Sequence, residues 1–307
     1  MTKKKNFSAI IGSGYFAKIY IKYLVKSKLT TLKKVFYKKN KPQILIKKYP
    51  NITFTNNLND ILKDKTIKDV FIITPIESHY LLFKKFLEAG KNCLVEKPLL
   101  TTKVNISKLD KKFSLLKRTV SYPYKYSHAL EFIKNYLNKN KLNNFRHIDI
   151  TFFQYGKFFN HNVEKILGPH AFTILNEFIN LDKLKHKKIL ISKNKGKNEK
   201  VRFDMYLKDK NIASINLCIN YSFKKVRLFE MIFDNSSICW EINNNKSEVT
   251  ISKIKREKYK NYKIGKKVFE IKKKFNENNN IEHVIEDFFS QSKSDLELSK
   301  NLLSLIQ

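Results

Sequence analysis

Residues 9–20 read AIIGSGYFAKIY, and this stretch decides the fold. It arranges Gly12, Gly14 and Ala17 as G-x-G-x-x-A in a chain that has only seven glycines and six alanines. An apolar β-rich run precedes the pattern and a helical pattern follows it. In that setting Gly12 would allow a sharp strand-to-helix turn, Gly14 would let a ligand approach the backbone, and Ala17 would keep helix and strand close.

The start of this helix is the first candidate binding site. Free backbone N–H groups at a helix N-terminus attract anions, so the pattern predicts a dinucleotide whose pyrophosphate lies against the turn. Tyr15 and Phe16, which open the helix, are included among the cofactor-binding candidates. The alternative is a glycine turn that binds nothing.

The end of the second predicted strand bears on which dinucleotide binds. An acid is expected about 20 residues beyond the glycines, where it would hold the ribose 2′-hydroxyl of NAD. This chain has Tyr37, Lys38 and Lys39 there, with no carboxylate. Cations would suit a 2′-phosphate, so Lys38 and Lys39 favour NADP over NAD. Because the chain is rich in lysine, these two lysines could also lie there by chance, without any role in cofactor binding.

Composition argues against a nucleic-acid partner despite a formal charge of +35. Only five of the 62 basic residues are arginines, the side chain that base readout favours, and the lysines run along the whole chain. A protein that binds nucleic acid would instead lose affinity for it steeply as the salt concentration rises. The three cysteines sit singly in apolar stretches and no stretch of 18 apolar residues occurs, so we expect a cytoplasmic protein.

The first third of the chain alternates β-rich runs with helical patterns. The runs lie at residues 7–12, 33–39, 69–74, 92–97 and 118–122, separated by amphipathic stretches such as SHYLLFKKFLEAG. Nearly uninterrupted apolar strands that alternate with helices are typical of βαβ units in a parallel sheet covered on both faces. We therefore predict an α/β fold that begins with a doubly wound dinucleotide-binding (Rossmann) domain over residues 1–122.

After residue 122 the pattern changes. A helix (127–139) leads into segments that alternate apolar and polar residues, and these lie at residues 145–155, 187–193, 200–208, 211–220, 226–234, 237–243 and 247–253. Such alternation is typical of an antiparallel sheet with one wet face. Two helical segments, 282–292 and 295–306, close the chain. We predict a second, α+β domain over residues 123–307 with a mostly antiparallel open sheet.

Two motifs follow apolar strands and so lie where open α/β sheets bind ligands: TPIESH (74–79) and VEKP (95–98). Together with the glycine pattern, the stretch VSYPYKYSHALEFIK, the helix GPHAFTILNEF and the late helix IEHVIEDFFSQ, they make the chain resemble the Gfo/Idh/MocA oxidoreductases, the family of glucose-fructose oxidoreductase and inositol dehydrogenase. The resemblance covers most of the chain.

The resemblance implies an NAD(P)-dependent dehydrogenase or reductase that moves a hydride to or from a carbinol carbon of a sugar, cyclitol or nucleotide-sugar. Lys97 would assist proton transfer beside the nicotinamide, and His170 would match the histidine of the family's D-x-x-x-H motif. The other implied cofactor residues are Thr74, Pro75, His79 and Glu96. Lys and His can accept such a proton when their pKa is tuned.

One departure from the family pattern leaves the mechanism open. Four residues before His170 the family has Asp, whereas this chain has Ile166. Three interpretations remain: a Lys97/His170 enzyme with an altered mechanism, an enzyme that uses Glu164 or Tyr124 instead, and a member with weak activity. The alternative function is a non-catalytic dinucleotide-binding regulatory or scaffold protein of the same fold.

The remaining expectations concern substrate, metal and partners. Aromatic faces and hydroxyls in YPYKY suit a carbohydrate, so we take Tyr122, Tyr124 and Lys125, with Glu164 and His170, as substrate residues. The sequence has neither H-E-x-x-H nor a zinc pattern, so we predict no metal. One face of the second sheet would pack against another subunit, which predicts a homodimer or homotetramer with no nucleic-acid or membrane partner.

Overall fold

The computed structural model describes residues 6–142, 144–155, 160–243, 245–259, 262–278, 280–290 and 296–306. The last two residues of the predicted helix 282–292 lie outside them. The chain forms two compact units. Unit 1 comprises Met1–Tyr122 and Ile281–Ser304, and unit 2 comprises Pro123–Asn280 and Leu305–Gln307. Residues 281–304, which we had placed in the second domain, therefore belong to unit 1 by their contacts.

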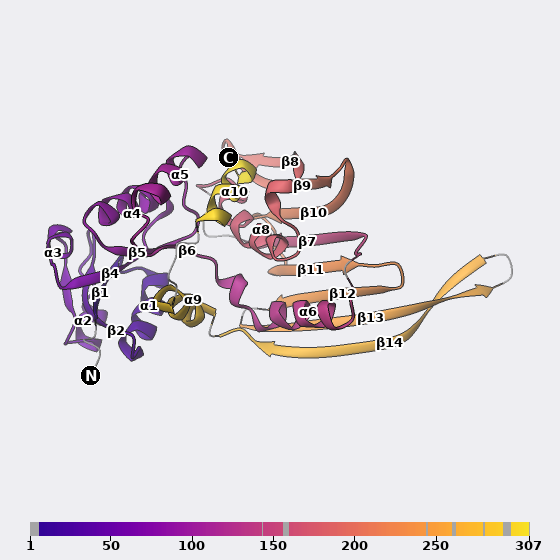
Figure 1. The fold of residues 1–307 in the computed structure, drawn as a ribbon, viewed down its shortest axis with the longest axis horizontal. Coiled ribbons are helices and arrows are strands. Elements are labelled where there is room, and N and C mark those ends of the chain that lie inside the picture. Colours follow the sequence, from indigo (N-terminus) through magenta and orange to yellow (C-terminus); the bar gives the residue numbers. More distant parts are fainter. Residues whose placement is uncertain are drawn as a thin grey trace. The chain divides into compact units, whose positions relative to one another are not determined.

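Unit 1 contains one parallel sheet in the order β3-β2-β1-β4-β5-β6 (Figure 1). Its strands are β1 (Asn6–Ile11), β2 (Thr30–Phe36), β3 (Thr53–Thr55), β4 (Ile67–Ile72), β5 (Asn92–Glu96) and β6 (Arg118–Ser121). Its helices are α1 (Tyr15–Lys26), α2 (Gln43–Lys48), α3 (Asn59–Leu62), η1 (Ile76–Ser78), α4 (His79–Glu88), α5 (Lys103–Lys112), α9 (Asn280–Ser290) and α10 (Glu297–Ile306). The predicted doubly wound Rossmann architecture is confirmed.

Burial explains why these elements form. The last four residues of β1, Ser8 to Ile11, are fully buried, as in a strand covered on both faces. Helix α1 buries Ala17, Tyr20, Ile21 and Leu24, one stripe at helical spacing.

The two C-terminal helices complete the core of unit 1. The rings of Phe288 and Phe289 on α9 lie 5.4 and 6.0 Å from that of Phe71 on β4. On α10, the Ser299 hydroxyl lies 2.8 Å from the Tyr122 hydroxyl. These contacts are the physical reason that residues 281–304 group with the N-terminal strands.

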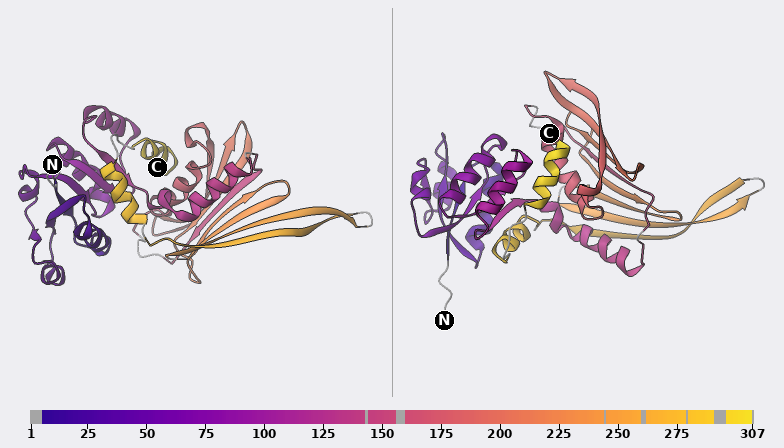
Figure 2. Two further views of the ribbon diagram at one scale, coloured as in Figure 1. Left: turned by 60° about the horizontal axis from the view of Figure 1, so that its bottom comes forward. Right: turned by 45° about the horizontal axis from the view of Figure 1, so that its top comes forward.

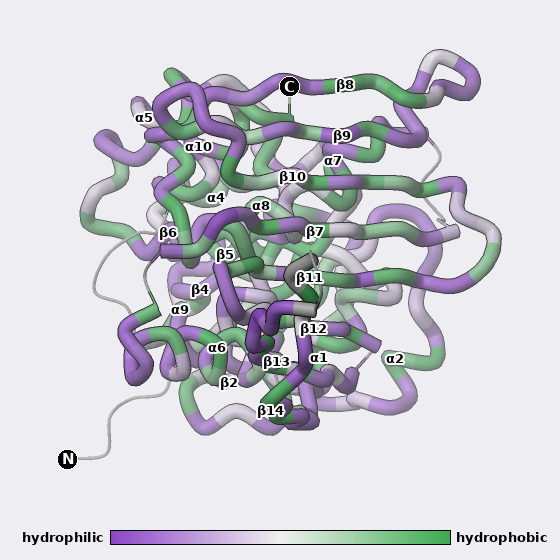
Figure 3. Tube along the Cα trace, turned by 90° about the vertical axis from the view of Figure 1, so that its right-hand side faces the viewer, coloured by the Kyte–Doolittle hydropathy of each residue, from purple (hydrophilic) through white to green (hydrophobic). Residues whose placement is uncertain are grey.

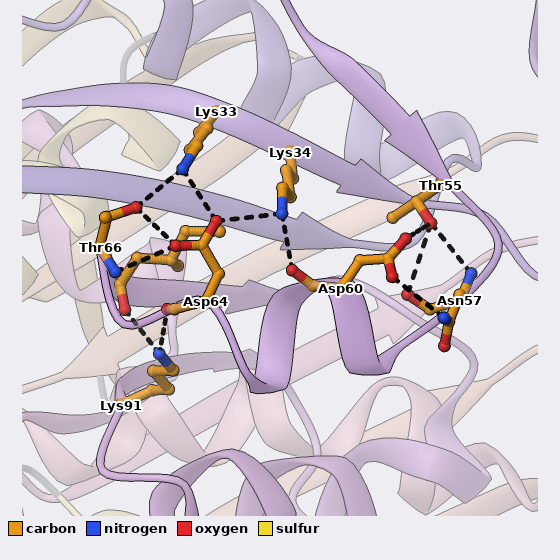
Figure 4. A network of polar contacts seen from close by, with 9 residues as sticks. Lys33, Lys34, Thr55, Asn57, Asp60, Asp64, Thr66 and Lys91 are labelled. Carbon is orange, nitrogen blue, oxygen red and sulfur yellow. Dashed lines mark hydrogen bonds and ion pairs between the residues drawn. The ribbon is translucent and has the colours of Figure 1, made fainter.

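A polar network fixes the amino ends of the strands (Figure 4). Asp64 accepts hydrogen bonds from Lys33 at 2.8 Å and from the Thr66 backbone at 3.0 Å, and Lys34 lies 3.0 Å away. Burial acts to raise the pKa of Asp64, but the bonds from Lys33, Thr66 and Lys34 outweigh it and hold that pKa well below its usual range. Buried Lys91 donates to the Asp64 and Ile67 carbonyls at 2.6 and 2.8 Å. This bracing lies at the edge of the sheet opposite the candidate site.

Unit 2 contains an eight-stranded sheet in the order β14-β13-β12-β11-β7-β10-β9-β8. All neighbouring pairs are antiparallel except β7 and β10, so the predicted mostly antiparallel sheet is confirmed. The strands are β7 (His147–Phe153), β8 (Lys185–Asn194), β9 (Lys197–Leu207), β10 (Lys210–Cys218), β11 (Val226–Ile232), β12 (Ser236–Asn243), β13 (Lys246–Tyr259) and β14 (Tyr262–Asn276).

Helices of unit 2 cover one face of this sheet. They are η2 (Pro123–Tyr126), α6 (His128–Lys139), α7 (Val163–Ile166), α8 (Gly168–Asn176) and η3 (Leu181–Lys183). Helix α6 packs on β13 and β14, α8 on β7, and α7 on β9 and β10 (Figure 2). In β7 and β11 every second residue is buried under them, and hydropathy alternates along the strands in Figure 3.

The β13–β14 hairpin continues past the rest of the sheet (Figure 1). Ser236, the first residue of β12, pairs with Lys253, so residues 254–259 pair only with β14. The hairpin base is held by two bonds: Ile254 N–H donates to the Asn235 carbonyl at 2.9 Å, and Arg256 donates to that of Asp234 at 3.1 Å.

Candidate functional site

The carboxyl ends of the parallel strands in unit 1 gather the predicted cofactor residues along one edge. In spatial order this edge carries Lys38 and Lys39 after β2, the glycine turn after β1, Thr74 after β4 and Lys97 after β5. Chain connections leave β1 and β4 toward opposite sides of the sheet. Such a switch point is where doubly wound sheets bind ligands.

The first glycine of the turn is required by the backbone itself. Gly12 has a φ of +123°, and a Cβ on it would stand 2.2 Å from the carbonyl oxygen of Ile73. Its N–H donates to the Phe36 carbonyl at 3.0 Å. The turn is therefore clamped between β2 and the end of β4, and no residue with a side chain fits.

The second glycine fits a pyrophosphate. A Cβ on Gly14 would meet nothing within 4 Å, so the residue borders open space. Gly14 caps α1 without a side-chain hydrogen bond, which leaves N–H groups of the first turn to a ligand. Ala17 is fully buried under the helix, while Tyr15 and Phe16 are 78% and 47% exposed. Open space beside Gly14 and burial of Ala17 are compatible with a bound pyrophosphate, and contact of this turn with a cofactor stays a prediction.

The two lysines that favour NADP lie just beyond β2. The strand ends at Phe36 rather than at residue 39, because the chain turns away after the Tyr37 N–H donates to the Thr55 carbonyl of β3 at 2.9 Å. Lys38 and Lys39 are exposed in the following loop. Their side chains thus stand in solvent at the strand end beside the glycine turn.

His79 connects two loops of this edge. Its ring is 1% exposed, with Nδ1 2.9 Å from the Pro98 carbonyl oxygen and Nε2 2.8 Å from that of Thr74. The Ser78 hydroxyl donates to the Pro75 carbonyl at 2.8 Å. His79 thereby ties the Thr74–Pro75 loop to the loop of Lys97. Contact of Thr74, Pro75 and His79 with the cofactor stays a prediction.

Glu96 ends β5 and Lys97 follows it. Glu96 is buried, and its Oε1 accepts a hydrogen bond from the Tyr20 hydroxyl of α1 at 2.7 Å. Burial and the neighbouring Glu96 charge raise the pKa of Tyr20 well above its usual value, so this phenol stays a donor. Lys97 is half-buried and precedes Pro98 through a cis peptide bond. The strand and helix α1 together fix the residue next to Lys97.

In unit 2, Tyr124 and His170 come together. Tyr124 lies on η2 and His170 on α8, and their ring centroids are 5.1 Å apart, edge to face. Behind them, the rings of Phe152 on β7 and Trp240 on β12 lie 5.8 and 6.4 Å from Tyr124. Phe152 and Trp240 are fully buried, so they form the floor on which this pair rests.

Sequence reasoning missed Arg227, which the structure places beside this pair. Arg227 is 5% exposed, and its guanidinium carbon lies 4.6 Å from the centroid of the Phe152 ring. Its N–H groups donate to the carbonyls of Phe153 at 3.1 Å and Val226 at 2.9 Å, and to the amide oxygen of Gln154. The pattern VRLFEMI puts this residue on the apolar face of β11, a signal that could have revealed it.

Glu164, the acid nearest in sequence to the missing family aspartate, is engaged through one of its two oxygens, and a role in the reaction stays a prediction. It is 1% exposed, and its Oε1 accepts from Lys188 at 2.5 Å and from Asn198 at 2.8 Å. Ile166 is buried as an apolar residue. The buried carboxylate of Glu164 is thus bound to β8 and β9.

The two other substrate candidates lie on either side of the unit boundary. Tyr122, in unit 1, is 5% exposed, and its hydroxyl lies 2.8 Å from that of Ser299. Lys125 is exposed on η2 of unit 2. Their contact with a substrate stays a prediction.

The N-terminal domain is similar to a known protein family. The Gfo/Idh/MocA family model, described as an oxidoreductase family with an NAD-binding Rossmann fold, matches residues 8–124. This domain belongs to the Gfo/Idh/MocA family. The predicted family and its NAD(P)-type cofactor are thereby confirmed for this domain.

One curated relative is also named an oxidoreductase. The chain is 41% identical over 68 residues to the uncharacterized oxidoreductase YhhX of Escherichia coli (strain K12). The match spans 22% of this chain and 20% of YhhX.

Solved structures extend the likeness to the whole fold. The UDP-N-acetylglucosamine 3-dehydrogenase GnnA from Acidithiobacillus ferrooxidans is 14% identical, with a TM-score of 0.76 over 99% of this chain and 96% of GnnA. The 3-ketoreductase KijD10 from Actinomadura kijaniata, in complex with TDP-benzene and NADP, is 12% identical, with a TM-score of 0.77 over 98% of this chain and 94% of KijD10. At these identities the likeness establishes the fold of the chain and nothing finer.

Two kinds of feature are absent from the described ranges. No group of three or more His, Cys, Asp or Glu side chains in them is arranged to hold a metal ion. No helix among the same residues combines the length and the apolar character needed to cross a bilayer.

Proposed function

We propose that this chain is an NAD(P)-dependent dehydrogenase or reductase that transfers a hydride between the nicotinamide and a carbinol or carbonyl carbon. The observation that carries the proposal is the edge of unit 1. A glycine-only turn meets an open helix N-terminus at the switch point, and Lys97 stands at the end of β5, two strands along. Membership of an NAD-binding oxidoreductase family supports it.

The proposed substrate is a sugar, cyclitol or nucleotide-sugar. GnnA and KijD10, which share the fold, are named for 3-dehydrogenase and 3-ketoreductase activities. A net charge of +35 would favour a phosphorylated or nucleotide-linked substrate. The bound coenzyme would supply or accept the hydride. Lys97 and His170 would assist the proton transfer at the substrate oxygen.

A titration with NADPH and NADH tests this proposal. We expect both reduced coenzymes to bind and NADPH to bind more tightly. The Lys38→Ala/Lys39→Ala variant should lose about tenfold in NADPH affinity, with little change for NADH, because only NADPH carries the extra phosphate. Lys47→Ala/Lys48→Ala on α2 is the matched control. The proposal fails if neither coenzyme binds at millimolar concentration.

A non-catalytic dinucleotide-binding protein of the same fold is the second candidate function. Ile166, buried where the family has an acid, favours it. Tight NADP binding without turnover on a panel of sugars and sugar nucleotides would support this candidate. The cytoplasmic location inferred from the sequence also stays a prediction.

We further propose a homodimer or homotetramer formed through the sheet face that the helices leave uncovered. This face carries Asp149, Glu230 and Glu241, and burial together with the other two charges raises the pKa of Glu230. The outer hairpin of the same chain is basic, with exposed Lys255 and Lys258. One copy's hairpin therefore complements another copy's face in charge.

Light scattering tests this association. We expect a mass of two or four chains at micromolar concentration, falling toward one chain as salt screens the charges. Glu230→Lys/Glu241→Lys should dissociate the assembly, whereas Glu131→Lys on α6 should not. A wild-type protein that is monomeric at low salt would contradict the proposal.

A further inference from the structure

Arg227 is a buried cation without a carboxylate. Within the described ranges, the groups that shift the pKa of Arg227 include no Asp or Glu, and its Nε is buried with no hydrogen-bond partner. The acceptors around it are neutral: two backbone carbonyls and the Gln154 amide. Removing a charge from water without a counter-ion is costly, so a purely structural role would be served better by an apolar side chain.

Arg227 and Tyr124 both lie against the Phe152 ring: the guanidinium carbon is 4.6 Å from its centroid and the Tyr124 ring is 5.8 Å from it. Burial raises the pKa of Tyr124, and the charge of Arg227 and its hydrogen bond act in the opposite direction. Burial lowers the pKa of Arg227, while Tyr124 raises it. Guanidinium N–H groups only donate, so the Tyr124 oxygen accepts from Arg227. The phenol hydrogen is then left to point at another acceptor.

We propose that Tyr124 is the proton donor to the substrate oxygen, and that Arg227 is the positioning residue that orients Tyr124 and stabilises its anion. This inference rests on the proposed function and deepens it. In reduction, the carbonyl carbon receives the hydride, and the electron pair of its π bond moves onto oxygen. The Tyr124 O–H bond breaks, the proton joins that oxygen, and the tyrosinate is reprotonated by solvent. Oxidation runs in reverse, with the substrate proton returning to Tyr124.

This arrangement accounts for the absent aspartate. Ile166 leaves no carboxylate at that position, and Glu164 is bound to Lys188 and Asn198. Tyr124, in contrast, is only half-buried and touches His170 edge to face. A phenol backed by a guanidinium would thus supply the acid that the family takes from Asp.

The charged and titratable groups that face Tyr124 come from three elements. They are His170 on α8, Arg227 on β11 and Glu277 just after β14, whose charge raises the pKa of Tyr124. Glu277 accepts from Ser127 at 2.9 Å and from Ser247 at 2.7 Å. Substituting Arg227 should therefore change the pKa of Tyr124.

The coupling can be measured without substrate or coenzyme. Fluorotyrosine incorporated into the protein gives one fluorine resonance per tyrosine, and Tyr124→Phe identifies the resonance of Tyr124. In Arg227→Gln, which removes the cation that stabilises the tyrosinate, we expect the titration midpoint of this resonance to rise by about one pH unit or more. Arg227→Lys, which keeps the charge, should shift it less. Arg202→Gln on β9 is the control.

An unchanged midpoint in Arg227→Gln overturns the inference. If that variant does not fold, Arg227→Lys decides the question, because a lysine has fewer donors in a different geometry. With the lysine, the midpoint must still move upward.

Kinetics separate this inference from the proposed function. With UDP-N-acetylglucosamine and other nucleotide-sugars as probes, Tyr124→Phe should lower kcat about 100-fold or more, with the coenzyme dissociation constant within twofold of wild type. Tyr136→Phe on α6 should be unaffected. Full kcat in Tyr124→Phe overturns the inference and leaves the proposed function standing. Absence of coenzyme binding in the wild type overturns the proposed function, and the fluorine titration still judges the Arg227–Tyr124 pair.

Discussion

Replacing Gly12 with alanine is expected to destabilise unit 1 by about 3 kcal/mol or more and to weaken coenzyme binding at least 100-fold, about the same free energy. At a φ of +123° the added Cβ would stand 2.2 Å from the Ile73 carbonyl oxygen, a backbone atom that cannot move without disturbing β4. The turn must open, and its amides would no longer converge on a phosphate. Urea unfolding and calorimetric titration with NADPH measure the two effects.

Two other glycines separate folding from binding in this experiment. Gly14→Ala has room for its Cβ and an ordinary φ of −74°, so it should fold as wild type and lose only coenzyme affinity. Gly196→Ala has a φ of +74° in a hairpin turn of unit 2, so it should lose about 1 kcal/mol of stability and no affinity. A Gly12→Ala protein with wild-type stability and affinity would contradict the assignment of this turn.

Replacing Lys97 with alanine is expected to lower kcat about 1,000-fold and to leave the coenzyme dissociation constant within a few-fold of wild type. The reason is that a proton-handling group acts on the substrate oxygen, whereas the glycine turn and the loop after β2 would hold the coenzyme. Single-turnover absorbance of the reduced coenzyme measures the step directly. Lys111→Ala on exposed α5 is the control.

Lys97→Arg makes the test sharper. Arginine keeps the positive charge but stays protonated, so it cannot exchange a proton. Loss of turnover in both variants supports proton transfer, and turnover retained by arginine alone indicates a purely electrostatic role. Coenzyme binding with a kcat that Lys97→Ala leaves unchanged would remove Lys97 from the reaction.

The sequence predicted the fold well where apolar patterns were strong, and less well where charges obscured them. Strand β14 was missed because lysines interrupt its alternation. Lys273 faces the helices with its Nζ 4.7 Å from the Phe132 ring, so a charged residue occupies a core-facing position. Strand β3 was missed because three residues carry too little periodicity. The last helices were predicted. The pattern of an amphipathic helix, however, does not show which part of the protein its apolar face packs against.

The candidate site was predictable where motifs follow strands. The glycine turn, Lys38, Thr74 and Lys97 fall along one edge because parallel strands bring their carboxyl ends together. The side-chain cluster in unit 2 was only partly foreseen. Tyr124 and His170 were singled out, whereas Arg227 stands more than 50 residues from either. It reaches Phe152, the residue against which Tyr124 packs, because β11 pairs with β7. Nor could the sequence show that Glu164 is bound to Lys188.

The imidazole between the Thr74 and Pro98 carbonyls has a mechanical consequence. Because one ring lies within hydrogen-bond distance of both loops, it fixes the spacing between Thr74 and Pro98, the residue next to Lys97, before any ligand binds. The lysine is therefore preorganised by the scaffold rather than recruited by the ligand, which lowers the entropic cost of reaching a reactive geometry.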